Sequence, residues 1–454
     1  MEIPPRGDNQ AVAGAATLAL GREAGPIMGA MSDTAATERR RLEMLPRAEL
    51  GCYQLQRLQR LLARILPANR FYAEKLAEVP LPPQSLEELS HWPYTYKEEL
   101  QVAHGVEPAN LTWPLQEYVR YHQTSGTRGR PLVVLDTRRD WQWWLDCWQY
   151  VLDAARVEPS DRVCMAFSFG PFIGFWSCYE AAAARGCLVI PAGGMNTLAR
   201  LELLRSSRAT VLCCTPSYAL HLAEVAAEHN LVPSELAVRV LILAGEPGGS
   251  VPSVRQRLQQ AWQADVLDHS GASEVGPWGY GDLAGHGLHV LESEFIAEFL
   301  AVSSGGPARE GELAELVLTS LGREGAPVIR YRTGDLVRPV WHHSLGCNFV
   351  LLEGGVVGRA DDMLVIRGVN VFPSAVDQIL RSFPEVLEYR ATALRRGELD
   401  HLRVEVEDRL GEPHRIAEEL RLRLGLRVEV VNVPLGTLPR FEGKGRRFID
   451  ERVR

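Results

Sequence analysis

The sequence predicts an α/β protein with a large N-terminal domain and a small C-terminal α/β domain. Between residues 160 and 270, apolar runs alternate with helical segments, which is typical of βαβ units and a mainly parallel sheet covered by helices. From residue 286 the apolar runs shorten and follow one another through turns, which indicates a small, antiparallel, strand-rich subdomain. After Gly358 a new order of short helices and strands begins.

The individual elements follow from the apolar patterns. The predicted parallel strands are Val163–Phe167, Cys187–Pro191, Thr210–Cys214 and Val238–Ala244. The predicted antiparallel strands are His289–Leu291, Glu315–Thr319, Asp335–Val340 and Phe349–Leu352. After Gly358, helices are expected at Val376–Ser382 and Pro413–Leu424, and strands at Val386–Leu394, Leu402–Glu407 and Arg427–Val433.

These patterns divide the chain at residues 45 and 358. Residues 1–45 are rich in Ala, Gly and Pro, and we expect them to form a disordered extension. Residues 46–358 form the predicted large domain, which starts with helical spacing of leucines from Arg47 to Leu76. Residues 359–454 form the predicted small domain.

The bulk properties exclude several classes of protein. A net charge of −8 and a pI near 5.9 argue against a nucleic-acid partner, which would favour a basic face. No segment approaches the ~20 apolar residues of a membrane-spanning helix, so no membrane contact is expected. The eight cysteines show no paired spacing, and Cys213 and Cys214 lie in an apolar run, where buried thiols are expected. A reducing cytoplasm fits this pattern.

A loop of glycine and hydroxyl residues lies between two strand-like segments. The backbone amides and hydroxyls of Thr124, Ser125, Gly126 and Thr127 can surround phosphate oxygens. The GKS/T ending of a Walker motif is absent. A hairpin turn without a ligand has the same composition, so both interpretations remain open.

Two further polar motifs follow apolar strands. Ser273 can lie near a phosphate, and Glu274 offers the carboxylate oxygens that Mg²⁺ prefers. Asp335, at a bend between two strand-like segments, can accept two hydrogen bonds from a ribose diol. An ordinary polar turn would look the same in each case.

The order of these motifs resembles the acyl-adenylate-forming ligase superfamily and, within it, the phenylacetate–CoA ligase branch. The resemblance extends from about residue 50 to residue 452. It is carried by Pro93–Leu100, Thr124–Pro131, Gly245–Pro247, Ser273–Pro277, Gly287–His289, Pro327–Asp335 and, as the longest segment, Gly358–Pro373.

The resemblance implies a role for each motif. In this family the large domain binds ATP and the acid, and the small domain is a mobile lid whose hinge corresponds to Asp361. Nucleotide contacts are implied for Thr124–Thr127 at the β- and γ-phosphates, for Gly245, Glu246 and Pro247 at the adenine, for Asp335 at the ribose, and for Arg359 at the ribose and phosphate. Catalytic roles are implied for Ser273, for Glu274 as a Mg²⁺ ligand, and for Lys444 at the substrate carboxylate and α-phosphate.

Lysine usage supports the role of Lys444. Only Lys75, Lys97 and Lys444 are lysines among the 49 basic residues. A lysine retained against this bias is less replaceable, because a compact ammonium that fits between two oxygens is not mimicked by a guanidinium fork. The implied reaction brings two anions together, so positive charge at the reacting oxygens lowers the barrier.

An aromatic segment at a strand-to-helix turn corresponds to the acyl pocket of the family. Phe167, Phe169 and Phe172 can hold a flat ring, so an aryl or arylacetic acid is the leading substrate. Helical spacing makes a core position the favoured interpretation for Phe172 and Trp176. The pocket is completed by Gly271 and by His269, which could touch the carboxylate or a ring substituent, or brace the backbone.

Two departures from the family pattern affect ligands. Ser270 stands where an aromatic residue usually stacks on the adenine. Relatives in this branch often carry cysteines that suggest a structural zinc. Here a mixed site remains conceivable, with loop histidines as the alternative. Its ligands would be His286, His289, His343 and Cys347.

The acceptor of the acyl group is coenzyme A in many members of the family. The alternative is an enzyme that loads the phosphopantetheine of a separate carrier protein, or an amine. A non-catalytic sensor of adenylates or acyl groups is a third hypothesis, which retention of the Lys444, Glu274, Asp335 and Arg359 motifs disfavours. A homodimer remains open.

Overall fold

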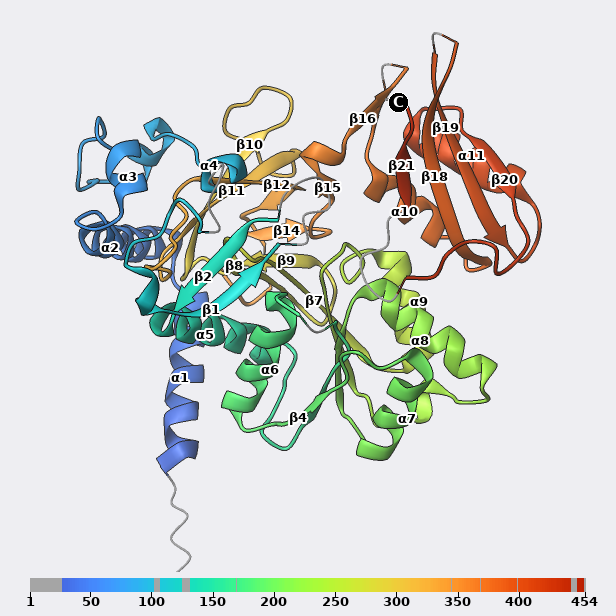
Figure 1. Ribbon diagram of the computed structural model, residues 1–454, viewed down its shortest axis with the longest axis horizontal. Coiled ribbons are helices and arrows are strands. Elements are labelled where there is room, and N and C mark those ends of the chain that lie inside the picture. The colour runs from blue at the N-terminus through green and yellow to red at the C-terminus, as the bar shows by residue number, and fades with distance from the viewer. Residues whose placement is uncertain are drawn as a thin grey trace, which may run out of the picture.

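The computed structural model describes residues 27–101, 107–124, 131–168, 170–343, 345–367, 369–397, 399–441 and 447–452 (Figure 1). The predicted α/β class is confirmed. Within the described residues the largest sheet has nine strands, in the order β13-β14-β9-β8-β7-β6-β5-β3-β4. Its strands are β3 (Arg162–Met165), β4 (Leu188–Pro191), β5 (Val211–Cys214), β6 (Val240–Ala244), β7 (Asp265–Ala272), β8 (Gly276–Gly281), β9 (Gly287–Val290), β13 (Pro339–Val340) and β14 (Leu351–Glu353).

The nine-stranded sheet is half parallel and half antiparallel. Strands β4, β3, β5, β6 and β7 pair in parallel, and the pairing from β7 through β8, β9, β14 and β13 is antiparallel. Some of the predicted antiparallel strands therefore continue the parallel sheet. The others form a second sheet, in the order β10-β11-β12-β15. Its strands are β10 (Phe295–Ala301), β11 (Ala314–Ser320), β12 (Tyr331–Val337) and β15 (Gly358–Arg359).

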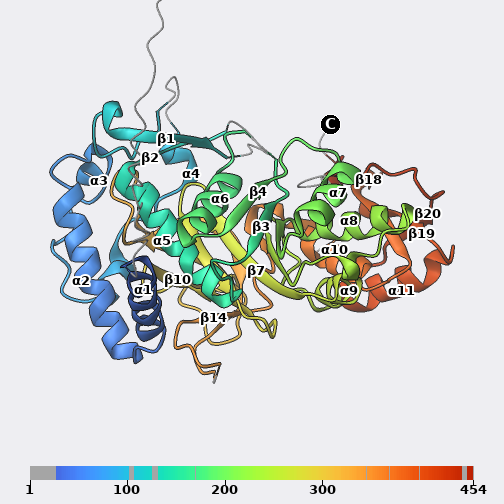
Figure 2. The same ribbon diagram turned by 90° about the horizontal axis from the view of Figure 1, so that it is seen from below.

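Both faces of the parallel strands are buried. Along β5, Val211 and Cys213 pack into one apolar cluster with α5 and α6, whereas Leu212 and Cys214 pack into another with α7, α8 and α9. This alternation follows from the two-residue period of a strand. It explains why the strands appear in the sequence as continuous apolar runs. The covering helices are α5 (Arg138–Ala154), α6 (Ile173–Arg185), α7 (Thr197–Ser207), α8 (Pro216–Glu228) and α9 (Pro252–Trp262), on the two sides of the strands in Figure 2.

The C-terminal part forms a separate lobe beside α8 and α9 (Figure 1). Its sheet has the order β20-β19-β18-β21 and contains only residues after 385. The predicted helices and strands of this part are present, and β16, β17 and β21 are additional strands that the apolar pattern did not indicate. The elements are β16 (Leu364–Ile366), β17 (Val369–Val371), α10 (Pro373–Arg381), β18 (Val386–Arg396), β19 (Leu399–Asp408), α11 (Pro413–Leu424), β20 (Glu429–Asn432) and β21 (Phe448–Asp450).

The remaining elements lie at the N-terminal side of the large domain. Helix α2 packs its leucines into an apolar cluster with Trp92 and Ile329. These elements are α2 (Arg47–Ile65), α3 (Arg70–Lys75), α4 (Lys97–Leu100) and the hairpin β1 (Tyr118–Gln123) and β2 (Val133–Thr137). In the part of the chain that the structure describes, no helix is both long and apolar enough to cross a membrane.

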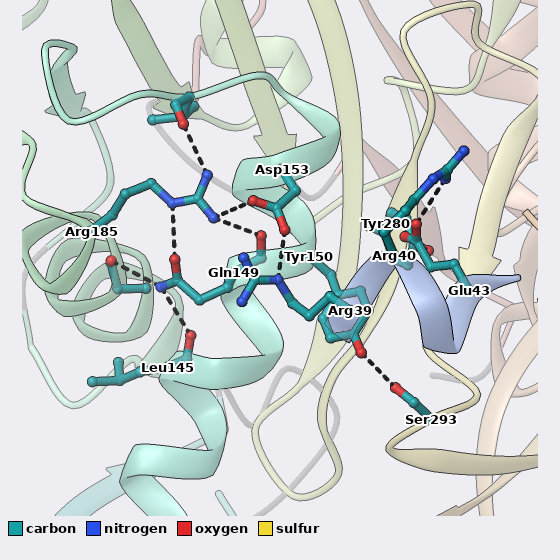
Figure 3. Close-up of polar contacts among 12 residues, drawn as sticks. Arg39, Arg40, Glu43, Leu145, Gln149, Tyr150, Asp153, Arg185, Tyr280 and Ser293 are labelled. Carbon is teal, nitrogen blue, oxygen red and sulfur yellow. Dashed lines mark hydrogen bonds and ion pairs between the residues drawn. The ribbon is translucent and has the colours of Figure 1, made fainter. Parts of the chain in front are cut away.

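The prediction of a disordered extension to residue 45 is wrong for its second part. Ile27–Glu43 form helix α1, and Leu42 and Leu45 are buried. Figure 3 shows how the helix is held: Arg39 donates to Asp153 of α5 at 2.6 Å, and Tyr280 of β8 donates to Glu43 at 2.6 Å. These contacts with distant parts of the chain stabilise a segment whose composition alone favours disorder. Residues 1–26 lie outside the described residues.

Replacing Leu42 by alanine should lower the free energy of unfolding by about 2–4 kcal/mol, because a buried leucine is lost and the space is only partly refilled. The value is obtained from urea denaturation followed by tryptophan fluorescence. Leu435→Ala is the matched control, since this leucine is 56% exposed. Equal stability of the two variants would contradict the packing of α1 on the large domain.

Candidate active site

The parallel strands bring several predicted site residues to one edge of the sheet. Phe167 follows the end of β3, and Gly245 follows the end of β6. In the β6–β7 pairing Ala244 lies opposite His269, so Gly245 and Ser270 occupy equivalent positions just beyond the last paired residues of these two strands. This edge is where ligands bind in open α/β sheets.

The predicted phosphate loop connects the two strands of a hairpin. β1 and β2 pair antiparallel, as expected from their flanking positions. The N–H of Thr124 donates to the carbonyl of Leu132 at 2.9 Å, and the Thr124 hydroxyl accepts from the N–H of Leu132 at 3.0 Å. These two bonds close the base of the loop. Ser125, Gly126 and Thr127 lie outside the described residues.

The predicted metal ligand Glu274 accepts a hydrogen bond from a buried tyrosine. The phenol of Tyr331, on β12, donates to Glu274 Oε1 at 2.8 Å. Burial, followed by the nearby Glu274 carboxylate, raises the pKa of Tyr331 well above its ordinary value, so the phenol stays protonated and remains a donor. Tyr331 thereby orients a carboxylate oxygen. No sequence motif indicated a separate role for Tyr331, although it lies four residues before Asp335 on the same strand.

Asp335 and Arg359, both predicted at the ribose, face each other across two paired strands. Asp335 of β12 lies opposite Arg359 of β15, and Arg359 Nη1 donates to Asp335 Oδ1 at 3.0 Å. The charges of both residues also act on the pKa of Tyr331, in opposite directions. Glu274, Tyr331, Asp335 and Arg359 therefore form one polar cluster, which we call the β12 cluster. The predicted hinge residue Asp361 follows directly, in the 3₁₀ turn Ala360–Asp362.

The predicted adenine segment lies beside the C-terminal lobe. Gly245 has a φ of +97°, a conformation that favours glycine. Glu246 Oε1 accepts from the N–H of Ser217, at the start of α8, at 2.8 Å. Burial lowers the pKa of Arg447, the Glu388 carboxylate raises it by more, and the Glu246 carboxylate is a smaller charge that also raises it.

Lys444 itself lies outside the described residues, but both flanks of its loop are described. Phe441 and Arg447 line a small hollow together with Ser217, His221 and Glu224 of α8. The segment that contains Lys444 therefore begins and ends next to the large domain, on the side of the predicted adenine segment.

His269 contacts a backbone carbonyl and an aromatic ring, as expected of a residue that braces the backbone. It is buried, its ring lies 4.3 Å from that of Trp148, and its Nδ1 lies 2.7 Å from the carbonyl oxygen of Gly279. Burial lowers the pKa of His269 to about 4. A neutral imidazole that donates its proton to a backbone carbonyl offers no positive charge to a carboxylate.

The aromatic segment differs from the prediction at two positions. Phe172 and Trp176, expected in the core, are 39% and 36% exposed, and Phe175 is the buried residue of this turn. The helix α6 starts at Ile173, one residue after Phe172, and its register turns Phe175 inward. Phe167 is half-buried, Gly271 is exposed, and Phe169 lies outside the described residues.

The hypothesis of a zinc site is not supported. His289 Nδ1 and His343 Nε2 both approach the carbonyl oxygen of Phe349, at 3.4 and 2.9 Å. Cys347 instead contacts the Tyr280 hydroxyl, and His286 pairs with Asp282. Throughout the described ranges, no group of three His, Cys, Asp or Glu side chains is arranged to hold a metal ion.

Replacing His269 by glutamine should make stability less sensitive to acid between pH 6.5 and about 4. In this range His269 takes up a proton in the unfolded state, whereas the folded imidazole, with its pKa of about 4, stays neutral. The free energy of unfolding of the wild-type protein therefore falls as the pH falls. Asp268, whose pKa burial raises to about 6, acts in the opposite direction and remains in both proteins. The unfolding free energies of the wild-type protein and of His269→Gln, measured across this range, should converge at low pH. Parallel curves for the two proteins would contradict a neutral, buried His269.

Comparisons with known proteins agree with this geometry. Residues 88–293 match the model of the AMP-binding enzyme family, and residues 368–452 match that of the AMP-binding enzyme C-terminal domain. Phenylacetate-coenzyme A ligase of Thermus thermophilus is 32% identical over 445 residues, which cover 90% of this chain and 98% of the relative.

The crystal structure of 2-hydroxyisobutyryl-CoA ligase in its postadenylation state is 28% identical and superposes with a TM-score of 0.85, over 91% of this chain and 92% of that one. With the same enzyme in the thioesterification state the TM-score is 0.68 over equal coverage. The described structure as a whole thus resembles the former state more than the latter. The chain belongs to the acyl-adenylate-forming ligase superfamily, in its phenylacetate–CoA ligase-like branch.

Proposed function

We propose that this protein is an AMP-forming acid–CoA ligase, which activates a small carboxylic acid with ATP and transfers the acyl group to coenzyme A. The observation that carries the proposal is the β12 cluster, in which Glu274, Asp335 and Arg359 meet around Tyr331. These three were assigned to the metal and the ribose from separate motifs. The relatives are named as coenzyme A ligases, which favours coenzyme A over a carrier protein or an amine.

The reaction has two steps, each with its own leaving group. An oxygen of the substrate carboxylate attacks the α-phosphorus of ATP, and the bond to pyrophosphate breaks. The sulfur of coenzyme A then attacks the acyl carbon of the adenylate, and AMP leaves. Because the first step joins two anions, the Lys444 ammonium stabilises the charge that gathers on the reacting oxygens.

The side chains present fit a magnesium ion and a nucleotide. Glu274 supplies carboxylate oxygens, the donor type that Mg²⁺ prefers, and Tyr331 fixes one of them. When bound, Mg²⁺ neutralises phosphate charge. Nucleotide contacts come from Thr124–Thr127 and Ser273 at the phosphates, Gly245–Pro247 at the adenine, and Asp335 and Arg359 at the ribose.

An aromatic acid is the substrate that we favour. Phe172 and Phe167 are not enclosed in the core, so they are available to line a pocket at the carboxyl edge of the sheet. Phenylacetate appears in the name of the relative from Thermus thermophilus, whereas the solved neighbour is named for an aliphatic hydroxy acid. The eight cysteines are free thiols, which supports a reducing, cytoplasmic location.

A panel of acids identifies the substrate and the acceptor together. Purified protein with ATP and Mg²⁺ should release pyrophosphate with one of the benzoic, hydroxybenzoic, anthranilic or arylacetic acids, and 2-hydroxyisobutyric acid should be a poor substrate. Coenzyme A should accelerate turnover and appear as a thioester by mass spectrometry. Pyrophosphate exchange without any effect of coenzyme A would instead favour the carrier-protein or amine reaction.

Replacing Lys444 by alanine should slow adenylate formation on the order of 10²–10³-fold, because one positioned cation is lost from the reacting oxygens. Transfer from chemically supplied acyl-adenylate to coenzyme A should stay near the wild-type rate, since that step does not use the lysine. Lys75→Ala is the control, because Lys75 pairs with Glu99 at 2.6 Å and belongs to no predicted site. Equal losses in both half-reactions would remove Lys444 from its proposed role.

A further inference from the structure

Arg323 is a charged side chain that the proposed reaction leaves unexplained. Its side chain is completely buried, as is that of its partner Asp136. Arg323 Nε and Nη2 lie 2.8 and 2.7 Å from Asp136 Oδ1, and Nη1 donates to the backbone carbonyl of Ser273 at 3.0 Å. One guanidinium therefore joins two segments that are 137 residues apart along the chain.

These two segments carry different parts of the nucleotide site. Asp136 lies on β2, the strand that leaves the predicted phosphate loop. Ser273 directly precedes Glu274, the proposed magnesium ligand. The two segments are attached to different sheets. β1 and β2 form a sheet of their own, whereas Ser273 directly follows β7 of the nine-stranded sheet. Among the described backbone pairings, no strand ladder joins the hairpin to β7, so their relative position depends on side chains.

Arg323 lies in the segment between β11 and β12, and the backbone of this segment is fixed both before and after Arg323. Asp140, at the start of α5, accepts from the N–H groups of Glu324 and Gly325 at 2.7 and 3.1 Å. A side chain at Gly322 would overlap the indole of Trp143, so the backbone there runs directly against α5. The guanidinium is thus held by a rigid support and not by a free loop.

Stability alone does not account for this ion pair. Taking two charges out of water is costly, and well-packed apolar residues of similar volume often serve stability as well or better. A planar guanidinium, however, donates in several fixed directions at once, which an apolar pair cannot do. Retention of the pair is therefore best explained by what it positions.

We propose that Arg323 is a positioning residue that sets the position of β2, and with it the base of the phosphate loop at Thr124, relative to Glu274. The proposal rests on the proposed function for the roles of Thr124–Thr127 and Glu274. Arg323 touches no substrate and acts through Asp136 and the Ser273 carbonyl. Its contribution is to align Thr124, which would lie next to the phosphates, with Glu274, which would hold the metal.

The test removes both charges together, so that no buried ion remains unpaired. In Arg323→Met/Asp136→Leu, affinity for Mg·ATP, measured by calorimetry without acid or coenzyme A, should fall on the order of 10- to 100-fold, because small misplacements in a site have large effects. The Mg²⁺ concentration that half-saturates pyrophosphate release should rise, while the KM for the acid stays near wild type. The melting temperature shows whether the variant is folded.

A matched control uses a similar arginine away from the nucleotide site. Arg185 bonds Asp153 at 2.5 Å and the carbonyl of Val157 at 2.9 Å, so it also joins a carboxylate to a backbone carbonyl (Figure 3). Arg185→Met/Asp153→Leu, which also removes the partner of Arg39, should lower the melting temperature and keep wild-type Mg·ATP affinity. Equal loss of Mg·ATP affinity in both pairs would overturn the proposal.

Two further outcomes separate this proposal from the proposed function. Wild-type protein that fails to bind Mg·ATP would overturn both. Wild-type protein that binds Mg·ATP, with a folded double variant of unchanged affinity, would overturn the role of Arg323 alone. If the double variant does not fold, Arg323→Lys takes its place, because an ammonium retains the charge without the planar fork, and unchanged affinity there would equally contradict the proposal.

Discussion

The constraint on which the site depends is the burial of both faces of the parallel strands. Because α5 and α6 cover one face and α7, α8 and α9 the other, polar side chains of β3, β5 and β6 have no place along the strands themselves. They gather where the strands end. The alignment of Ala244 with His269 then sets Gly245 and Ser270 side by side at that edge. The strand pairing therefore decides which motifs can meet a common ligand.

Tertiary contacts at this edge are made largely by hydrogen bonds to fixed donors and acceptors. Tyr331 donates to Glu274, His269 braces the carbonyl of Gly279, and Arg323 donates to that of Ser273. Burial keeps the phenol protonated and the imidazole neutral, so neither changes its role near neutral pH. These supporting groups surround the residues proposed to bind ligands, and such support is what holds a site in a productive geometry.

The C-terminal lobe presents charged side chains to the large domain. The charges of Glu246 and Glu224 of the large domain act on Arg447 and Arg440 of the lobe, whereas the ion pairs Arg447–Glu388 and Arg440–Glu407 lie within the lobe. Contacts of this polar kind are typical of domains that move relative to one another. The higher TM-score with the postadenylation state of 2-hydroxyisobutyryl-CoA ligase than with its thioesterification state fits a lobe that takes more than one position in this family.

The sequence by itself determined the α/β class, most strands of both lobes and the motif order, because apolar periodicity and turn chemistry are local. It failed where distant contacts decide the outcome. Leu42 and Leu45 are buried where helix α1 bonds to α5 and β8, and Phe172 is exposed just before the start of α6. Only the tertiary structure joined Tyr331 to Glu274 and Arg323 to Asp136, since each pair is separated by tens of residues or more and no local pattern encodes such a meeting.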